Sequence, residues 1–316
     1  MLSSILLSAS RSARLRQIVA TTRCTRPVVD RFVAGEDLGD ALGTVRELTA
    51  AGLTVTLDYL GEDVTDRAGA TAVRDAYLRL LDMLGPEGLG TGAEVSVKLS
   101  AFGQALEKDG HDVALANVRQ VCQAADVAGT TVTLDMEDHT TVDSTLAILD
   151  DLRKEHPATG AVLQSYLYRT EEDCHRLAVP GSRVRLVKGA YREPSSVAYQ
   201  DKHQVDLAYV RCLRVLMAGG GYPMIGSHDP RLIRIAQDLA SRYGRAAGEY
   251  EFQMLYGIRT DEQHRLVEQG ERVRVYTPYG SDWYGYFMRR LAERPANLAF
   301  FLRSFVPSGP RLLTRH

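Results

Sequence analysis

The alternation of short β-prone runs with longer helical segments predicts an α/β protein built on a closed (βα)8 barrel of the TIM type. Repeated βα units imply a parallel sheet, and about eight of them suggest that the sheet closes on itself. The length of 316 residues is long for one average domain but typical of such a barrel. No linker rich in proline, glycine or serine interrupts the series, so we expect one barrel.

The expected strands are short β-prone runs bounded by turn residues. In chain order they are Thr54–Tyr59, Glu94–Leu99, Thr131–Met136, Ala161–Tyr166, Val184–Val187, Pro223–Ser227, Tyr250–Leu255 and Arg272–Tyr276. Segments with helical periodicity, such as residues 112–128 and 230–243, lie between them. We expect the barrel over residues 46–300, after an N-terminal helical arm (residues 1–45) and before a C-terminal tail (residues 301–316).

The last clear helix, residues 283–294, divides into two faces at helical spacing. An apolar stripe consists of Tyr284, Phe287, Met288 and Leu291. The opposite side carries Tyr286, Arg289, Arg290 and Glu293. Two adjacent guanidinium groups match the oxygens of a small carboxylate ligand, because each arginine presents a planar fork of donors. The alternative is an amphipathic surface helix whose charges face water.

Composition excludes several classes of protein. A net charge of −2 argues against a nucleic-acid binder, and no apolar run approaches the ~18 residues that span a bilayer. The four cysteines are far apart without a CxxC pair, which favours a reducing compartment and no zinc site. Residues 1–29 contain arginines and serines but no acid, as in a transit peptide, although a short amphipathic helix is favoured. A cytoplasmic location is therefore expected.

A nucleotide-binding sheet is the competing architecture. Residues 88–93 (GLGTGA) match the letters of the dinucleotide fingerprint, but they precede a strand instead of opening a helix. The helix N-terminus that would bind a pyrophosphate is therefore missing, and we interpret this segment as a loop.

Polar residues intrude near the carboxyl ends of the expected strands, where a parallel barrel has its active site. They are Lys98, Asp135, Glu137, Gln164, Arg185, Lys188, His228, Gln253 and Tyr276. A lone buried charge is costly, but charges of both signs at one end of a barrel compensate one another. Each residue alone is also explained by a salt bridge at the barrel rim, whereas the whole set favours a functional site.

Several chemistries fit this set of side chains. His139 and His228 with neighbouring acids suggest a metal, but the metal-binding spacings HxH and HExxH are absent. Lys188 or Lys98 at a strand end is also typical of a Schiff-base lysine, which would make the protein an aldolase-like lyase.

The combination of motifs discriminates between these possibilities. In order, the chain carries DYLGE from residue 58, VSVKLS from 95, LDME from 134, VRLVKGAY from 184, YEFQ from 250 and YFMRRLAER from 286. Together they resemble the proline dehydrogenase family, in particular its short bacterial monofunctional type, from about residue 30 to residue 297. The most specific pair is RLVKGAY followed by the double-arginine helix.

The resemblance implies a distorted (βα)8 barrel that binds FAD non-covalently, with the last helix over the barrel mouth. It implies oxidation of L-proline to Δ1-pyrroline-5-carboxylate by hydride transfer to flavin N5. Lys98, Arg289 and Arg290 would hold the proline carboxylate, and Tyr286 would pack on its ring. Asp135 and Arg185 match catalytic-site residues, and Glu62 matches an acid that gates the site by pairing with Arg289.

The resemblance also assigns residues around the cofactor. Flavin-contacting positions match Met136, Gln164, Arg185, Lys188, Gly189, Ala190, Ser227 and His228, where Ser227 replaces the more usual threonine. Gln253 and Tyr276 match positions near the cofactor. A membrane quinone is the implied electron acceptor, and residues 300–306 (FFLRSFV) suggest either peripheral contact with a membrane or a docked tail.

Overall fold

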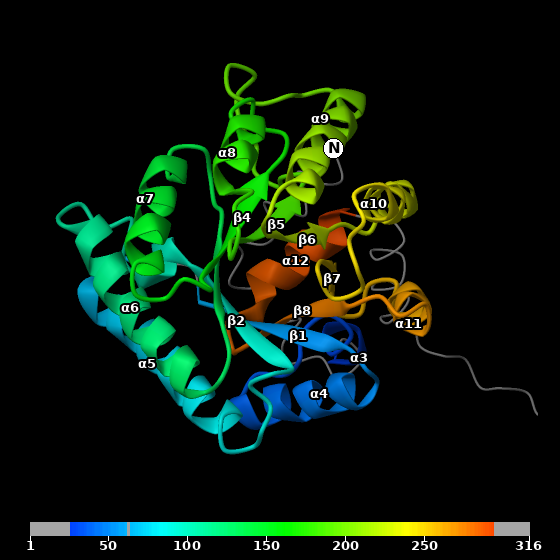
Figure 1. The fold of residues 1–316 in the computed structure, drawn as a ribbon. Coiled ribbons are helices and arrows are strands. Elements are labelled where there is room, and N and C mark those ends of the chain that lie inside the picture. The colour runs from blue at the N-terminus through cyan, green and yellow to red at the C-terminus, as the bar shows by residue number, and fades with distance from the viewer. Residues whose placement is uncertain (1–25, 62–63, 294–316) are drawn as a thin grey trace, which may run out of the picture.

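The computed structural model describes residues 26–61 and 64–293, and in it eight parallel strands close into one barrel in sequence order (Figure 1). The strands are β1 (Thr54–Tyr59), β2 (Ala93–Lys98), β3 (Val132–Asp135), β4 (Gly160–Gln164), β5 (Arg183–Val187), β6 (Tyr222–Gly226), β7 (Glu251–Leu255) and β8 (Val273–Tyr279). Every predicted strand is present, and β1 has the predicted bounds. The predicted fold class is confirmed.

A ring of helices surrounds the barrel (Figure 1). Each strand from β1 to β7 is followed by a helix of this ring: α5 (Arg67–Leu84), α6 (Gly110–Val127), α7 (Val142–Arg153), α8 (Thr170–Leu177), α9 (Lys202–Ala218), α10 (Pro230–Arg242) and α11 (Thr260–Glu268). A short 3-10 helix, η1 (Leu99–Phe102), lies between β2 and α6. The ring is completed between α11 and α5 by α4 (Leu38–Ala50), which precedes β1 and spans the predicted border at residue 45.

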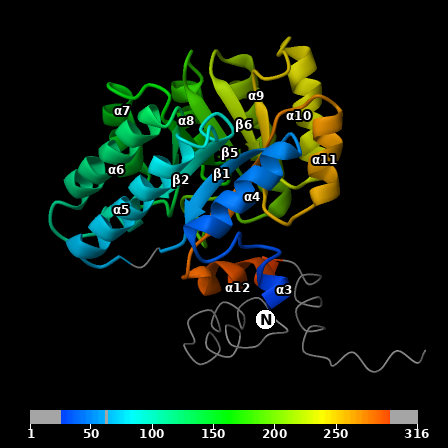
Figure 2. The same ribbon diagram turned by 90° about the horizontal axis from the view of Figure 1, so that it is seen from below.

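The helix after β8, α12 (Trp283–Glu293), leaves the ring and lies across one end of the barrel beside α3 (Arg26–Val29), as Figure 2 shows. A separate apolar cluster fixes it there, formed by side chains of both segments. The rings of Phe32 and Phe287 are 6.3 Å apart, and Trp283 Nε1 donates a hydrogen bond to Glu36 Oε1 at 3.1 Å. The predicted position of the last helix over the barrel mouth is therefore confirmed.

Tyr286, which helical spacing assigns to the same side as Arg290, is buried. It belongs to the apolar cluster and is 7% exposed. The guanidinium carbon of Arg290 lies 5.1 Å from the centre of the Tyr286 ring. The described residues contain no helix long and apolar enough to cross a membrane.

Side chains alternate along the strands between an apolar outer face and a polar interior. Val55 and Leu57 of β1 belong to the main hydrophobic core, whereas Thr56 and Asp58 are buried polar residues. The buried polar positions on the other strands include Glu94, Ser96, Thr133, Arg185, Glu251, Gln253 and Arg274. Barrel interiors are usually filled by layers of branched apolar side chains. This barrel is instead filled largely by ion pairs and hydrogen bonds, which positions charged groups directly beneath its mouth.

Candidate active site

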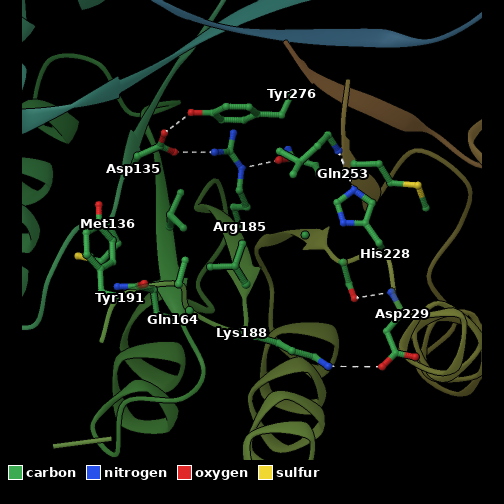
Figure 3. A pocket seen from close by; sticks show the side chains of 18 of the residues that line it. Asp135, Met136, Gln164, Arg185, Lys188, Tyr191, His228, Asp229, Gln253 and Tyr276 are labelled. Carbon is green, nitrogen blue, oxygen red and sulfur yellow. Dashed lines mark hydrogen bonds and ion pairs between the residues drawn. The ribbon is translucent and has the colours of Figure 1, made fainter. Parts of the chain in front are cut away.

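A cavity of about 650 Å³ opens at the carboxyl ends of the strands (Figure 3). Arg290 of α12 is among the residues that line it. The cavity volume lies within the range of small-molecule binding sites. Residues of β3 to β8 and of the segments that follow them contribute most of its wall. The cavity is therefore at the end of the barrel where the polar strand ends predicted it.

Asp135 at the end of β3 is the centre of a hydrogen-bond network (Figure 3). Its Oδ1 accepts from Arg185 Nη1 at 2.6 Å and from Ser96 Oγ at 2.7 Å, and its Oδ2 accepts from the Tyr276 hydroxyl at 2.7 Å. Burial and the charge of Asp135 raise the pKa of Tyr276 well above its usual value, so this phenol is a neutral donor near pH 7. Asp135 thus holds Arg185 and Tyr276 in fixed positions at the cavity wall.

Arg185 is almost completely buried on β5 and touches the network on several sides. Its Nε donates to Gln253 Oε1, Nη1 also reaches Ser96 Oγ at 3.1 Å, and its guanidinium carbon lies 5.3 Å from the centre of the Tyr276 ring. Among the described residues, no group accepts a hydrogen bond from the buried Nη2. This nitrogen faces the buried carboxylate of Glu94 on β2, whose Oε1 lies 3.6 Å away.

Lys98 at the end of β2 faces Asp58 of β1. The Lys98 Nζ lies 2.8 Å from each carboxylate oxygen of Asp58, 3.9 Å from Asp135 and 3.5 Å from the Tyr276 hydroxyl. Asp58 is 2% exposed, so Lys98 pairs with a carboxylate that is almost fully buried. Lys98 therefore brings positive charge to the cavity next to Asp135.

The opposite wall of the cavity is formed by the loop that follows β5 and by the segment between β6 and α10. Lys188 Nζ contacts Asp229 at 3.4 Å (Figure 3) and Asp206 at 2.5 Å. Asp229 also caps α10 by accepting from Arg231 N at 3.0 Å, and bonds from the Arg231 side chain hold the pKa of its carboxyl well below the usual range. Pro230 takes the first position of α10, where its missing N–H costs nothing.

His228 and Gly189 complete this wall. The His228 Nε2 accepts from the backbone N–H of Leu255 at 2.9 Å, which fixes the imidazole against β7. Gly189 has φ +115°, and a Cβ atom there would overlap the Tyr166 ring. The loop after β5 therefore requires glycine at this position in order to lie close to Tyr166.

The structure brings most of the predicted site residues together around the cavity. They are Lys98, Asp135, Met136, Gln164, Arg185, Lys188, Gly189, Ala190, Ser227, His228, Gln253, Tyr276 and Arg290. Tyr286 is not one of the described residues that line it. Glu62 and the Arg289 side chain lie outside the described residues.

Sequence reasoning missed several residues at the site. Tyr191, Lys202 and Asp229 line the cavity, and Asp58 binds Lys98 beneath it. Asp58 interrupts its strand in the same way as Asp135 does, so the same signal was present. Asp229 before Pro230 carries the signature of a helix start. Nothing in the sequence distinguishes Lys202 from other surface lysines.

Comparison with known proteins identifies relatives over most of the chain. A family model described as Proline dehydrogenase matches residues 41–303. The chain is 38% identical over 282 residues to proline dehydrogenase 1 of Bacillus subtilis, covering 89% of this chain and 92% of the relative. It is 41% identical over 283 residues to the proline dehydrogenase of Deinococcus radiodurans, covering 88% and 90%.

A solved structure has a similar barrel. The chain matches proline utilization A (PutA) from Bdellovibrio bacteriovorus, in a crystal structure described as inactivated by N-propargylglycine, with a TM-score of 0.79 and 26% identity. The match covers 89% of this chain and 34% of the longer protein. This chain thus corresponds in length to the shorter relatives and to about a third of the PutA chain.

Proposed function

This chain belongs to the proline dehydrogenase family, and we propose that it oxidises L-proline to Δ1-pyrroline-5-carboxylate with a bound FAD, as the first step of proline catabolism. The observation that carries the proposal is the concentration of Lys98, Asp135, Arg185 and Tyr276 in one cavity beneath the arginine-bearing helix α12. This arrangement suits a small carboxylate substrate beside a larger anionic cofactor.

The cavity fits a flavin nucleotide in its chemistry. Lys188 and Lys202 supply positive charge for a pyrophosphate, and Arg185 adds a guanidinium group to the cavity wall. We propose that Met136, Gln164, Arg185, Lys188, Gly189, Ala190, Ser227 and His228 hold the cofactor. When bound, the flavin supplies the hydride acceptor at N5, and the protein supplies binding, orientation and electrostatics.

The substrate would be held by its carboxylate. We propose that Lys98, Arg289 and Arg290 bind these oxygens, since Lys98 and Arg290 both line the cavity and arginine pairs bidentately with carboxylates. Tyr286 lies under the Arg290 guanidinium and would support that side chain and the proline ring above the site. When a group is transferred between a bound substrate and a bound cofactor, holding the two in a fixed relative orientation contributes much of the rate enhancement.

Asp135 and Arg185 would orient the reacting groups. Asp135 accepts from three side chains and keeps Arg185 and Tyr276 at the wall, so its proposed role is to maintain the charged geometry of the site. We further propose that Glu62 pairs with Arg289 to close the site. The electron acceptor is proposed to be a membrane quinone, reached by peripheral contact of the protein with the membrane surface.

The rival function is a Schiff-base lyase that uses Lys98 or Lys188. A Schiff-base lysine attacks as a neutral amine and is usually activated in an apolar pocket or beside another cation. Here each of the two lysines lies against two carboxylates: Lys98 against Asp58 and Asp135, and Lys188 against Asp206 and Asp229. Neither lysine therefore has the apolar or cationic surroundings that activate an imine-forming amine.

The test uses the full chain purified and reconstituted with FAD. We expect flavin absorbance bands that stay with the protein through gel filtration, and formation of a product that reacts with o-aminobenzaldehyde when proline and an artificial electron acceptor are added. Loss of all flavin on gel filtration would contradict the proposal. A borohydride-trapped substrate adduct on Lys98 or Lys188 in flavin-free protein would establish the lyase instead.

A further inference from the structure

Beneath the cavity, charged side chains form a continuous chain of contacts through the barrel interior, which we call the ionic column. Within the described part of the structure it consists of four basic and four acidic residues: Lys98, Arg183, Arg185, Arg274, Asp58, Glu94, Asp135 and Glu251. The charges balance, so the column is neutral as a whole. It connects the amino ends of the strands with the cavity at their carboxyl ends.

Glu94 is the acid through which three arginines of this column meet. Its Oε2 lies 2.6 Å from Arg183 Nη2, and its Oε1 lies 3.6 Å from Arg185 Nη2 and 3.7 Å from Arg274 Nε. Burial alone would raise the pKa of the Glu94 carboxyl, but these arginines hold it well below its usual range. Glu94 is therefore a fixed negative charge, 1% exposed, directly beside the guanidinium group that reaches the cavity.

Threonine hydroxyls fix the direction of this carboxylate. Thr56 donates to Glu94 Oε1 at 2.8 Å, and Thr131 donates to Oε2 at 3.0 Å. Thr131 in turn accepts from Arg183 Nη1 at 2.6 Å, so the acid and its strongest partner share a hydroxyl. With both oxygens engaged, Glu94 has little freedom to follow a movement of Arg185.

The other sides of Arg185 are held by groups that belong to the cavity wall. Asp135 and Ser96 accept from its Nη1, and Gln253 accepts from its Nε. Gln253 presents its oxygen to Arg185 because its Nε2 donates to Glu251 at 2.6 Å. The Nη2 side of Arg185 is the one that faces Glu94.

We propose that Glu94 is a positioning residue for Arg185, fixing its guanidinium from below and offsetting part of its positive charge under the cofactor. The effect of Glu94 on the cofactor rests on the proposed function, whereas its positioning of Arg185 does not. Glu94 does not line the cavity among the described residues, so it acts through Arg185 rather than by touching a ligand. Reduced flavin carries more negative charge than oxidised flavin, so the net field of Arg185 and Glu94 contributes to the balance between the two forms.

The first measurement requires no cofactor. In cofactor-free protein, hydrogen exchange of the Arg185 Nε–H is followed by arginine-selective ¹H–¹⁵N NMR, with the signal assigned by Arg185→Lys. We expect exchange in Glu94→Gln to be about tenfold faster or more, because the guanidinium loses a fixed charged neighbour. An unchanged exchange rate would refute the positioning role, whether or not the protein binds FAD.

The second measurement is the reduction potential of the bound flavin. Removing the negative charge in Glu94→Gln should favour the reduced form, on the order of threefold or more in the equilibrium constant. Glu94→Gln/Arg183→Gln restores the neutrality of the column and should return the potential to that of the wild type. Equal reduction potentials in the wild type, Glu94→Gln and the double variant would refute the charge role. A shift of the same size in Glu94→Gln and in the double variant would also refute it.

Two further variants separate this role from mere stability. Glu94→Asp keeps the charge on a shorter side chain. In this variant the Arg185 Nε–H should exchange faster than in the wild type, while the reduction potential of the flavin should stay at the wild-type value. If Glu94→Gln does not fold, Glu94→Asp provides the test. Glu87→Gln removes an acid of the same type from an ion pair with Arg46 on the protein surface, and it should change neither quantity. Wild-type protein without flavin would contradict the proposed function and leave the exchange measurement to decide the role of Glu94.

Discussion

The contact between Lys98 and Asp58 allows a quantitative prediction about stability. Asp58 is 2% exposed and has both carboxylate oxygens 2.8 Å from Lys98 Nζ. Lys98→Met would leave this carboxylate buried without its ammonium partner, which typically costs about 3–5 kcal/mol. Asp58→Asn should cost less, about 1–3 kcal/mol, because Lys98 keeps Asp135 at 3.9 Å and is more exposed than Asp58.

The double variant Asp58→Asn/Lys98→Met removes both charges together. It should therefore be more stable than the Lys98→Met variant, and the cycle should show a coupling of about 2 kcal/mol or more. The free energy of unfolding is measured in urea on cofactor-free protein, by the fluorescence of Trp283, the single tryptophan, and by circular dichroism. Both probes must report the same transition, because a chain of this length does not always unfold in two states.

A matched control comes from the surface pair Arg46–Glu87, whose side chains are 53% and 29% exposed. The same cycle there should give a coupling of no more than about 1 kcal/mol, because water screens the charges. Additive effects of the Asp58 and Lys98 substitutions would refute the reasoning that the pair depends on burial. The double variant should recover stability but not proline affinity, since it still lacks the Lys98 charge.

Substitutions at three other positions test the cavity and the helix above it. Arg290→Lys should raise KM for proline about tenfold or more with flavin retained, because a point charge cannot replace a bidentate fork; an unchanged KM in steady-state kinetics would place this side chain outside the substrate site. Gly189→Ala should weaken FAD binding at least about tenfold in a fluorescence titration, because the new methyl group overlaps Tyr166 at a backbone φ of +115°; wild-type affinity would show that the loop after β5 adjusts freely. Tyr286→Phe should leave KM for proline near the wild-type value because the ring under Arg290 remains, whereas Tyr286→Ser should raise it and lower Tm; equal effects of the two would mean that the hydroxyl, not the ring, matters.

The strands and the position of the site were predictable because both depend on local patterns. Runs such as TVTLDY and EVSVKL alternate with a period of two, and their last polar residues, Asp58 and Lys98, lie at the barrel mouth. The same alternation also places Glu94 inside the barrel. Its significance was missed because the sequence does not show that the arginines of distant strands meet it.

The surroundings of α12 were less predictable. Helical spacing assigns Tyr286 to the polar side, but it is buried and belongs to an apolar cluster that also contains Phe32 of the N-terminal segment. Such burial depends on contacts between the two ends of the chain, which periodicity within one helix does not contain. In the same way, nothing local indicates that α4 fills the place in the ring that the last helix leaves.

The central claim is that this barrel oxidises proline with a flavin. An anaerobic titration of the FAD-loaded protein with L-proline tests it most directly, with the flavin absorbance and the pyrroline product measured in the same cuvette. We predict that the absorbance band bleaches as proline is added, with one pyrroline formed for each flavin reduced. A flavin band that persists in excess proline, with no pyrroline formed, would contradict the account.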